Sequence, residues 1–69
     1  MSRKYTINVY VKYNFDGTRE WVAEYPDISG LVGVGNTKMK AIYMAEEAKD
    51  MYLDYLEKEG ISFPEKREL

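Results

Sequence analysis

Carboxylates are the side chains best suited to chemistry in this 69-residue chain, because the sequence contains neither cysteine nor histidine. Five of them recur at helical spacing within one segment: Glu46, Glu47, Asp50, Asp54 and Glu57. Clustered carboxylates can hold a divalent cation for hydrolysis, or can attract a basic partner by their charge. The missing residue types exclude disulfides, thiolate metal sites and imidazole general bases.

Metal-dependent hydrolysis needs several carboxylates that converge on one point. Residues 4–13, the first expected strand, contain no acid, and Asp16 lies in an expected turn. Glu24 is expected to face solvent, and the five helical acids should point away from the sheet. We therefore expect no catalytic, metal-binding or cofactor-binding residues. The five acids are candidates for contact with a basic partner, although an ordinary solvated face is the simpler interpretation.

Two segments with alternating apolar and polar residues are predicted to form the strands on which the rest of the chain packs. Residues 4–13 and 19–25 alternate apolar and polar side chains, which is typical of strands with one buried face. Between them, Asp16-Gly17 favours a hairpin turn, since both residue types tolerate positive φ. Pro26 should end the second strand, because it has no N–H to donate. The inward-facing set of the first strand is predicted to be Tyr5, Ile7, Val9, Val11 and Tyr13.

A short strand over residues 31–35 and a helix over residues 37–59 are predicted next. Glycines in this strand leave room for the close approach of the helix backbone. Thr37 or Asn36 can cap the start of the helix, and Gly60 is typical of the position after its end. A brief final strand is predicted over residues 61–63. The class is then α+β, with two layers in the order β-β-β-α-β.

The helical segment is amphipathic at 100° per residue. Its central buried line is predicted to be Ala41, Ala45, Ala48, Tyr52 and Leu56. Flanking this line are Met44, Met51 and Tyr55 on one side and Ile42 and Leu53 on the other. The acids occupy the opposite face.

The second face of the sheet is more apolar than a solvated face should be. It is predicted to carry Tyr10, Val22, Val32 and Val34. We interpret this set as an oligomer interface, with scattered exposed apolar residues as the alternative. A homo-oligomer, dimer or higher, is the simplest use of such a face in so small a domain.

Composition narrows the function classes. With 12 acidic and 10 basic residues the net charge is −2, which argues against a nucleic-acid binder. No apolar run reaches the roughly 20 residues of a membrane helix, and no signal peptide is recognisable. We expect a single domain over residues 1–69, located in the cytoplasm, with no membrane contact.

An ordered set of short motifs resembles the N-terminal domain of the HicB antitoxin family. The motifs are Trp21-Val22-Ala23, Pro26-Asp27-Ile28-Ser29-Gly30, Gly35-Asn36-Thr37, Ala41 with Ala45, and the segment 61–64. Asn36 stands where the family usually has aspartate, and lysines replace its acids in the first helical turn.

The resemblance implies a partial ribonuclease-H-like fold, in which a short last strand returns beside the first. It also implies an antitoxin that sterically masks a small basic HicA-type ribonuclease toxin. Full-length members add a DNA-binding domain, which we do not expect here, so direct DNA binding is not expected either. The alternatives are a stand-alone oligomeric structural or regulatory domain without a toxin partner and, less favoured, a nucleic-acid enzyme.

Overall fold

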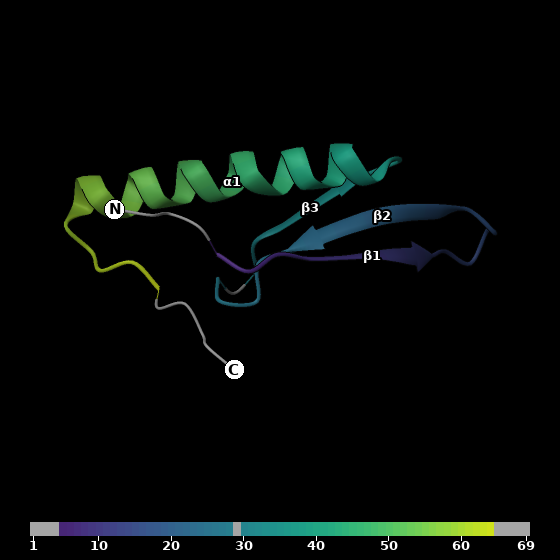
Figure 1. The fold of residues 1–69 in the computed structure, drawn as a ribbon, viewed down its shortest axis with the longest axis horizontal. Helices are drawn as coiled ribbons and strands as arrows, with labels where there is room; N and C mark the ends of the chain where they lie inside the picture. Colours follow the sequence, from purple (N-terminus) through teal and green to yellow (C-terminus); the bar gives the residue numbers. More distant parts are fainter. Residues whose placement is uncertain (1–4, 29, 65–69) are drawn as a thin grey trace.

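Three strands and one helix form two layers in the computed structural model, which describes residues 5–28 and 30–64. The strands are β1 (Asn8–Tyr13), β2 (Arg19–Glu24) and β3 (Val32–Gly35), and they pair antiparallel in the order β1-β2-β3. The helix α1 (Lys38–Glu59) covers one face of this sheet (Figure 1). The α+β class and the three-stranded meander are therefore as predicted.

The β1–β2 hairpin turns where Asp16-Gly17 predicts. The Asp16 carboxylate accepts hydrogen bonds from the Thr18 N–H (3.0 Å) and the Thr18 hydroxyl (2.6 Å), and Gly17 has φ +86°. These two donors hold the pKa of Asp16 below its usual value. The first strand is shorter than predicted: residues 5–7 belong to no strand, and Lys4 lies outside the described residues.

The connection from β2 to β3 folds back on itself and contributes to the core. The Ile28 N–H donates to the Tyr25 carbonyl (3.0 Å), and the Leu31 N–H donates to the Ile28 carbonyl (3.2 Å). Tyr25 and Ile28 are buried and pack with Ala23, Ala41 and Ala45 in the central cluster. Loop residues therefore close one end of the core.

Both helix ends carry the predicted caps. The Thr37 hydroxyl accepts from the Lys40 N–H at 3.1 Å, and Gly60 adopts the left-handed conformation with φ 71°. After Gly60, the Ile61 N–H donates to the Leu56 carbonyl (2.9 Å). These bonds satisfy backbone groups that a helix leaves unpaired at its ends.

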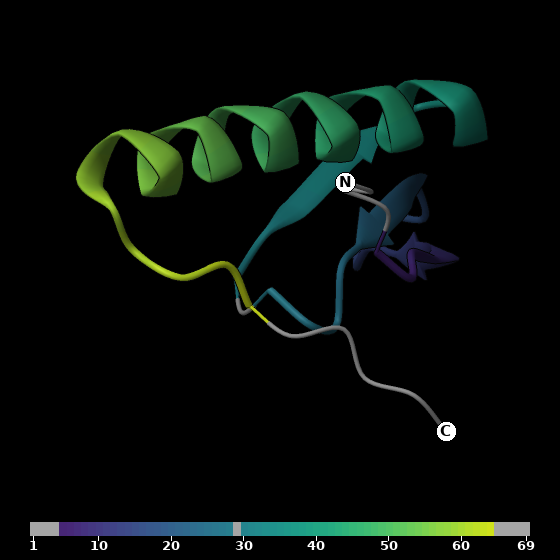
Figure 2. The same ribbon diagram turned by 60° about the vertical axis from the view of Figure 1, so that its left-hand side comes forward.

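The helix lies on the edge strand β3 rather than on the middle of the sheet (Figure 2). Gly33 makes this possible: a Cβ there would lie 2.5 Å from the Ala41 carbonyl oxygen and 2.9 Å from the Ala45 Cα. The backbones of β3 and α1 are thus in direct contact. The predicted role of the glycines in this strand is confirmed.

The buried side of the helix is rotated from the predicted line. Leu53 is fully buried, whereas Tyr52, predicted at the centre of the line, is 37% exposed. Because β3 is an edge strand, the rest of the sheet lies to one side of the helix, and burial shifts toward Ile42, Lys49 and Leu53. On the other flank, three residues predicted to border the core are exposed: Met44, Met51 and Tyr55.

The same offset explains Tyr13. This residue was predicted to face the core, yet its side chain is 73% exposed. Tyr13 ends β1, the strand with the fewest neighbours on the helix. A helix centred on β3 leaves the far strand of the sheet only partly covered.

The predicted final strand over residues 61–63 is absent; these residues form no strand. The Ile61 N–H is already used at the end of the helix, and the segment then runs back beneath α1 (Figure 2). It is tied to the start of the described chain by a side chain, because the Tyr5 hydroxyl donates to the Pro64 carbonyl at 2.8 Å. The described sheet therefore stays three-stranded.

Candidate functional site

Two surfaces on opposite layers of the domain are candidates for function. The first is the acidic stripe on α1, which comprises the predicted residues Glu46, Glu47, Asp50, Asp54 and Glu57. All five side chains are exposed. At 100° per residue they fall within an arc of about 100° on the outer side of the helix. The structure thus brings the predicted partner-binding acids together along one line.

Lys49 lies between the acidic stripe and the core, on the side of the helix that faces the sheet. Its side chain is only 11% exposed, and its Nζ lies 5.4 Å from the centre of the Tyr25 ring and 3.8 Å from Asp50 Oδ1. Burial raises the pKa of Tyr25, and the negative charges of Glu46 and Asp50 add to this effect. The sequence analysis did not predict burial of Lys49, although this residue follows Ala41 and Ala45 at four-residue spacing.

At its N-terminal end the acidic stripe contacts Tyr43, which lies within the same arc of the helix. The Tyr43 hydroxyl is hydrogen-bonded to Glu47, and this bond, followed by the charge of Glu47, raises the pKa of Tyr43. The stripe therefore combines carboxylates with an exposed tyrosine, a residue type enriched in protein interfaces.

The carboxylates do not converge as a metal centre would require. Across residues 5–28 and 30–64 there is no group of three or more acidic side chains placed to hold a metal ion. Asp16 is in the β1–β2 hairpin and Glu24 is on β2, away from the acidic stripe. The acids of the stripe are spread along the helix, an arrangement suited to long-range attraction rather than to coordination.

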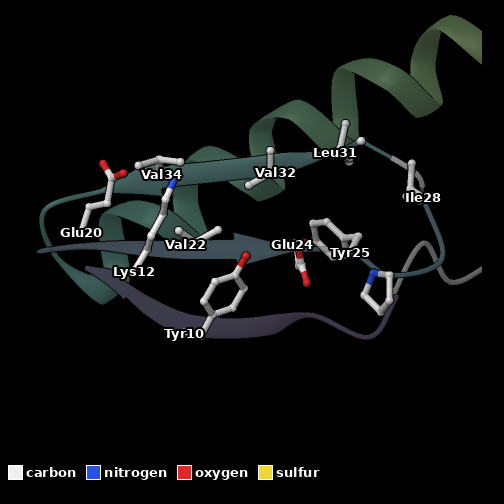
Figure 3. Close-up of a pocket in the computed structure, with 12 residues that line it drawn as sticks. Tyr10, Lys12, Glu20, Val22, Glu24, Tyr25, Ile28, Leu31, Val32 and Val34 are labelled. Atoms are coloured by element: carbon white, nitrogen blue, oxygen red, sulfur yellow. The ribbon is translucent and has the colours of Figure 1, made fainter. Parts of the chain in front are cut away.

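The second candidate is the open sheet face, the side of the sheet that α1 does not cover. It carries the four predicted residues Tyr10, Val22, Val32 and Val34 (Figure 3). In the strand register Tyr10 pairs with Val22, and Val22 pairs with Val34, so one apolar row crosses all three strands. Side chains that face each other across strands in this way pack directly.

A shallow hollow of about 460 Å³ lies on the open sheet face. Tyr10 reaches from β1 to β2, and Lys12 extends from β1 across β2 (Figure 3), which explains why Val22 is only 5% exposed although nothing from the helix layer covers it. Tyr10, Val32 and Val34 remain between 44% and 47% exposed. The apolar row is therefore partly packed within the chain and partly open.

Charges border this apolar row, although none of them belongs to the predicted oligomer interface. Lys12, Glu20 and Glu24 line the hollow, with Lys12 and Glu20 directly opposite each other in the register. Within the described residues none of the three forms an ion pair. They lie two residues before or after the apolar row on β1 and β2, so the alternation of each strand places them on the same face.

No described helix is both long enough and apolar enough to cross a membrane. Comparisons of the chain with protein-family models, with curated proteins and with solved structures find no match. The two surfaces and the sequence motifs are therefore the features from which a function can be inferred.

Proposed function

We propose that the chain is a HicB-like, non-catalytic protein-binding domain that masks a small basic HicA-type ribonuclease toxin. The observation that carries this proposal is the acidic stripe: five exposed carboxylates on one side of a single helix. Such a stripe attracts a basic protein and holds it by charge, while the bulk of the helix blocks access to the partner's surface. The site of action is the cytoplasm, where a ribonuclease meets its RNA.

The fold supports the family part of the proposal. The order β1-β2-β3-α1 agrees with the expected meander and covering helix, although the expected last strand is missing from the described residues. Pro26 follows the end of β2, Thr37 caps α1, and Ala41 and Ala45 lie in the helix contact with β3. We accordingly propose kinship with the partial ribonuclease-H-like fold.

Electrostatic binding of this kind has a measurable signature. Charges on an exposed surface are screened over about 8 Å at physiological ionic strength. A partner held by the acidic stripe should therefore bind tightly at low salt and dissociate as salt rises. An oligomer held by apolar contacts should change little over the same range, because burial of apolar surface is not screened.

The test is affinity purification of a tagged copy from its native cells at low salt, with the mass of the complex measured by light scattering. A stoichiometric small basic partner with ribonuclease activity supports the proposal. The variant Asp50→Lys/Asp54→Lys should lose this partner. The matched control is Glu59→Lys, which reverses an exposed acid of the same helix outside the stripe.

Two results would overturn the proposal. One is a purified chain that carries no basic protein at low salt. The other is a partner that the double reversal and the control release equally. In either case the stand-alone oligomeric domain becomes the better assignment, because the half-exposed apolar residues of the open sheet face favour it.

A further inference from the structure

We propose that a second copy of this chain packs on the open sheet face, so that two sheets stack face to face between two outer helices. The inference does not rest on the proposed toxin, because it uses the layer opposite the acidic stripe. Its basis is the apolar row of Tyr10, Val22 and Val34 together with the charges that border it.

Sheet-on-sheet packing needs an apolar inner face whose side chains can interdigitate across about 10 Å. The register supplies this face: Tyr10, Val22 and Val34 form a row across the sheet, and Val32 extends it along β3. The exposed fractions of 44–47% for Tyr10, Val32 and Val34 leave their outer halves available for a second layer. The face has the residue pattern of a sandwich core with one sheet missing.

The area is sufficient for a reversible dimer. Three strands spaced about 4.8 Å apart, with side chains included, offer on the order of 500 Å². Two copies would then bury roughly 1,000 Å² in total, which is the lower limit for a specific interface. We therefore expect a dimer with a Kd on the order of 10 μM rather than a permanent assembly.

The charges on this face favour a second copy in a defined orientation. Lys12 lies on one side of the apolar row, next to Glu20, and Glu24 lies on the opposite side of the row. When two copies stack with antiparallel strands about the row, Glu20 of one copy lies opposite Glu24 of the second, and Lys12 lies beside both carboxylates and offsets their repulsion. A two-fold interface repeats this contact twice, since every pair occurs in both directions.

The acidic stripe and the β3 edge are poor sites for self-association. Two acidic stripes would repel each other. Pairing of two β3 edges would set the strands about 4.8 Å apart. Each helix lies directly over its own β3, and packed helices need about 8–10 Å between their axes. The helices would therefore collide before the strands could pair.

The test is sedimentation equilibrium of the purified chain, over concentrations that bracket the expected Kd. Val34→Glu should raise the Kd by about 30-fold or more, because it buries a carboxylate within the apolar row of the interface. Met51→Glu is the matched control, since it changes an apolar side chain that is 69% exposed on the helix layer. Circular dichroism would verify that both variants keep the wild-type fold.

A charge exchange tests the orientation and guards against a variant that merely misfolds. Lys12→Glu should weaken the dimer, and adding Glu24→Lys should restore most of the lost affinity. A chain that remains monomeric at several hundred micromolar overturns the proposal. So does a dimer that survives Val34→Glu, or one in which the exchange restores nothing. Asp50→Lys/Asp54→Lys should leave the dimer intact, so failure of the toxin proposal stays separable.

Discussion

Gly33 and Ala45 lie in backbone contact: a Cβ added to Gly33 would come within 2.9 Å of the Ala45 Cα. This contact sets the distance between β3 and α1, because backbone atoms, unlike the end of a flexible side chain, cannot move aside at small cost. The offset of the helix toward the sheet edge, and with it the exposure of the acidic stripe, depends on this contact.

Gly33→Ala should therefore destabilise the domain by about 3 kcal/mol, the upper end of the usual range for overpacking, because its neighbours are rigid backbone atoms. Urea denaturation followed by circular dichroism measures this change. Gly17→Ala is the control: it meets no atom within 4 Å, and its positive φ costs about 1 kcal/mol. If the two variants lose equal stability, the helix does not touch β3 as described.

Leu53 and Tyr52 provide a second test, which concerns the rotation of the helix. Leu53→Ala should cost about 2–5 kcal/mol, since a fully buried leucine leaves a cavity. Tyr52→Ala should cost about 1 kcal/mol or less, because its side chain is already 37% exposed. Denaturation of both variants under the same conditions decides the point. The reverse order of losses would restore the helix orientation predicted from sequence.

The rotation also shows how far sequence reasoning reaches for this chain. Alternation, the turn at Asp16-Gly17 and the caps at Thr37 and Gly60 are local signals, and each predicted its element within a few residues. The buried line of the helix depends on which strand lies under it, and that information is not local. Because the Gly33 contact places α1 on an edge strand, Tyr52 turned outward and Lys49 turned inward.

Predictions about surface residues also succeeded where the signal was local and failed where it depended on contacts between distant residues. Tyr10, Val22, Val32 and Val34 were found because a strand's two-residue period assigns faces directly. The predicted strand over residues 61–63 failed because its first N–H is used by the Leu56 carbonyl, a contact that depends on how the helix ends. The charges bordering the open sheet face had a visible signal in the alternation but needed the register to pair Lys12 with Glu20.

Tyr25 predicts how stability depends on alkaline pH. Burial, with the charges of Glu46 and Asp50, raises its pKa in the folded state above the ordinary value of 10.0. The unfolded chain then loses this proton at a lower pH than the folded chain. The stabilisation is present below the unfolded pKa and is lost as pH rises through the folded one.

Urea denaturation between pH 9 and about 11 should therefore show falling stability. Tyr25→Phe should reduce the slope of that fall. Tyr13→Phe, which alters a side chain that is 73% exposed, is the control and should leave the slope unchanged. An equal slope in the wild type and in Tyr25→Phe would show that the Tyr25 hydroxyl is neither buried nor close to these acids.

Because the two surfaces lie on opposite layers of the domain, the two proposals together predict the stoichiometry of the complex with the basic partner. A dimer joined through the open sheet face leaves both acidic stripes on its outer layers, far from the two-fold axis. Each stripe can then hold one basic partner, so we expect a 2:2 complex by light scattering. Val34→Glu should convert it to a 1:1 complex that still binds the partner, while Asp50→Lys/Asp54→Lys should give the bare dimer. A 2:1 complex would mean instead that one partner bridges both copies, and that the acidic stripes lie closer together than face-to-face packing allows.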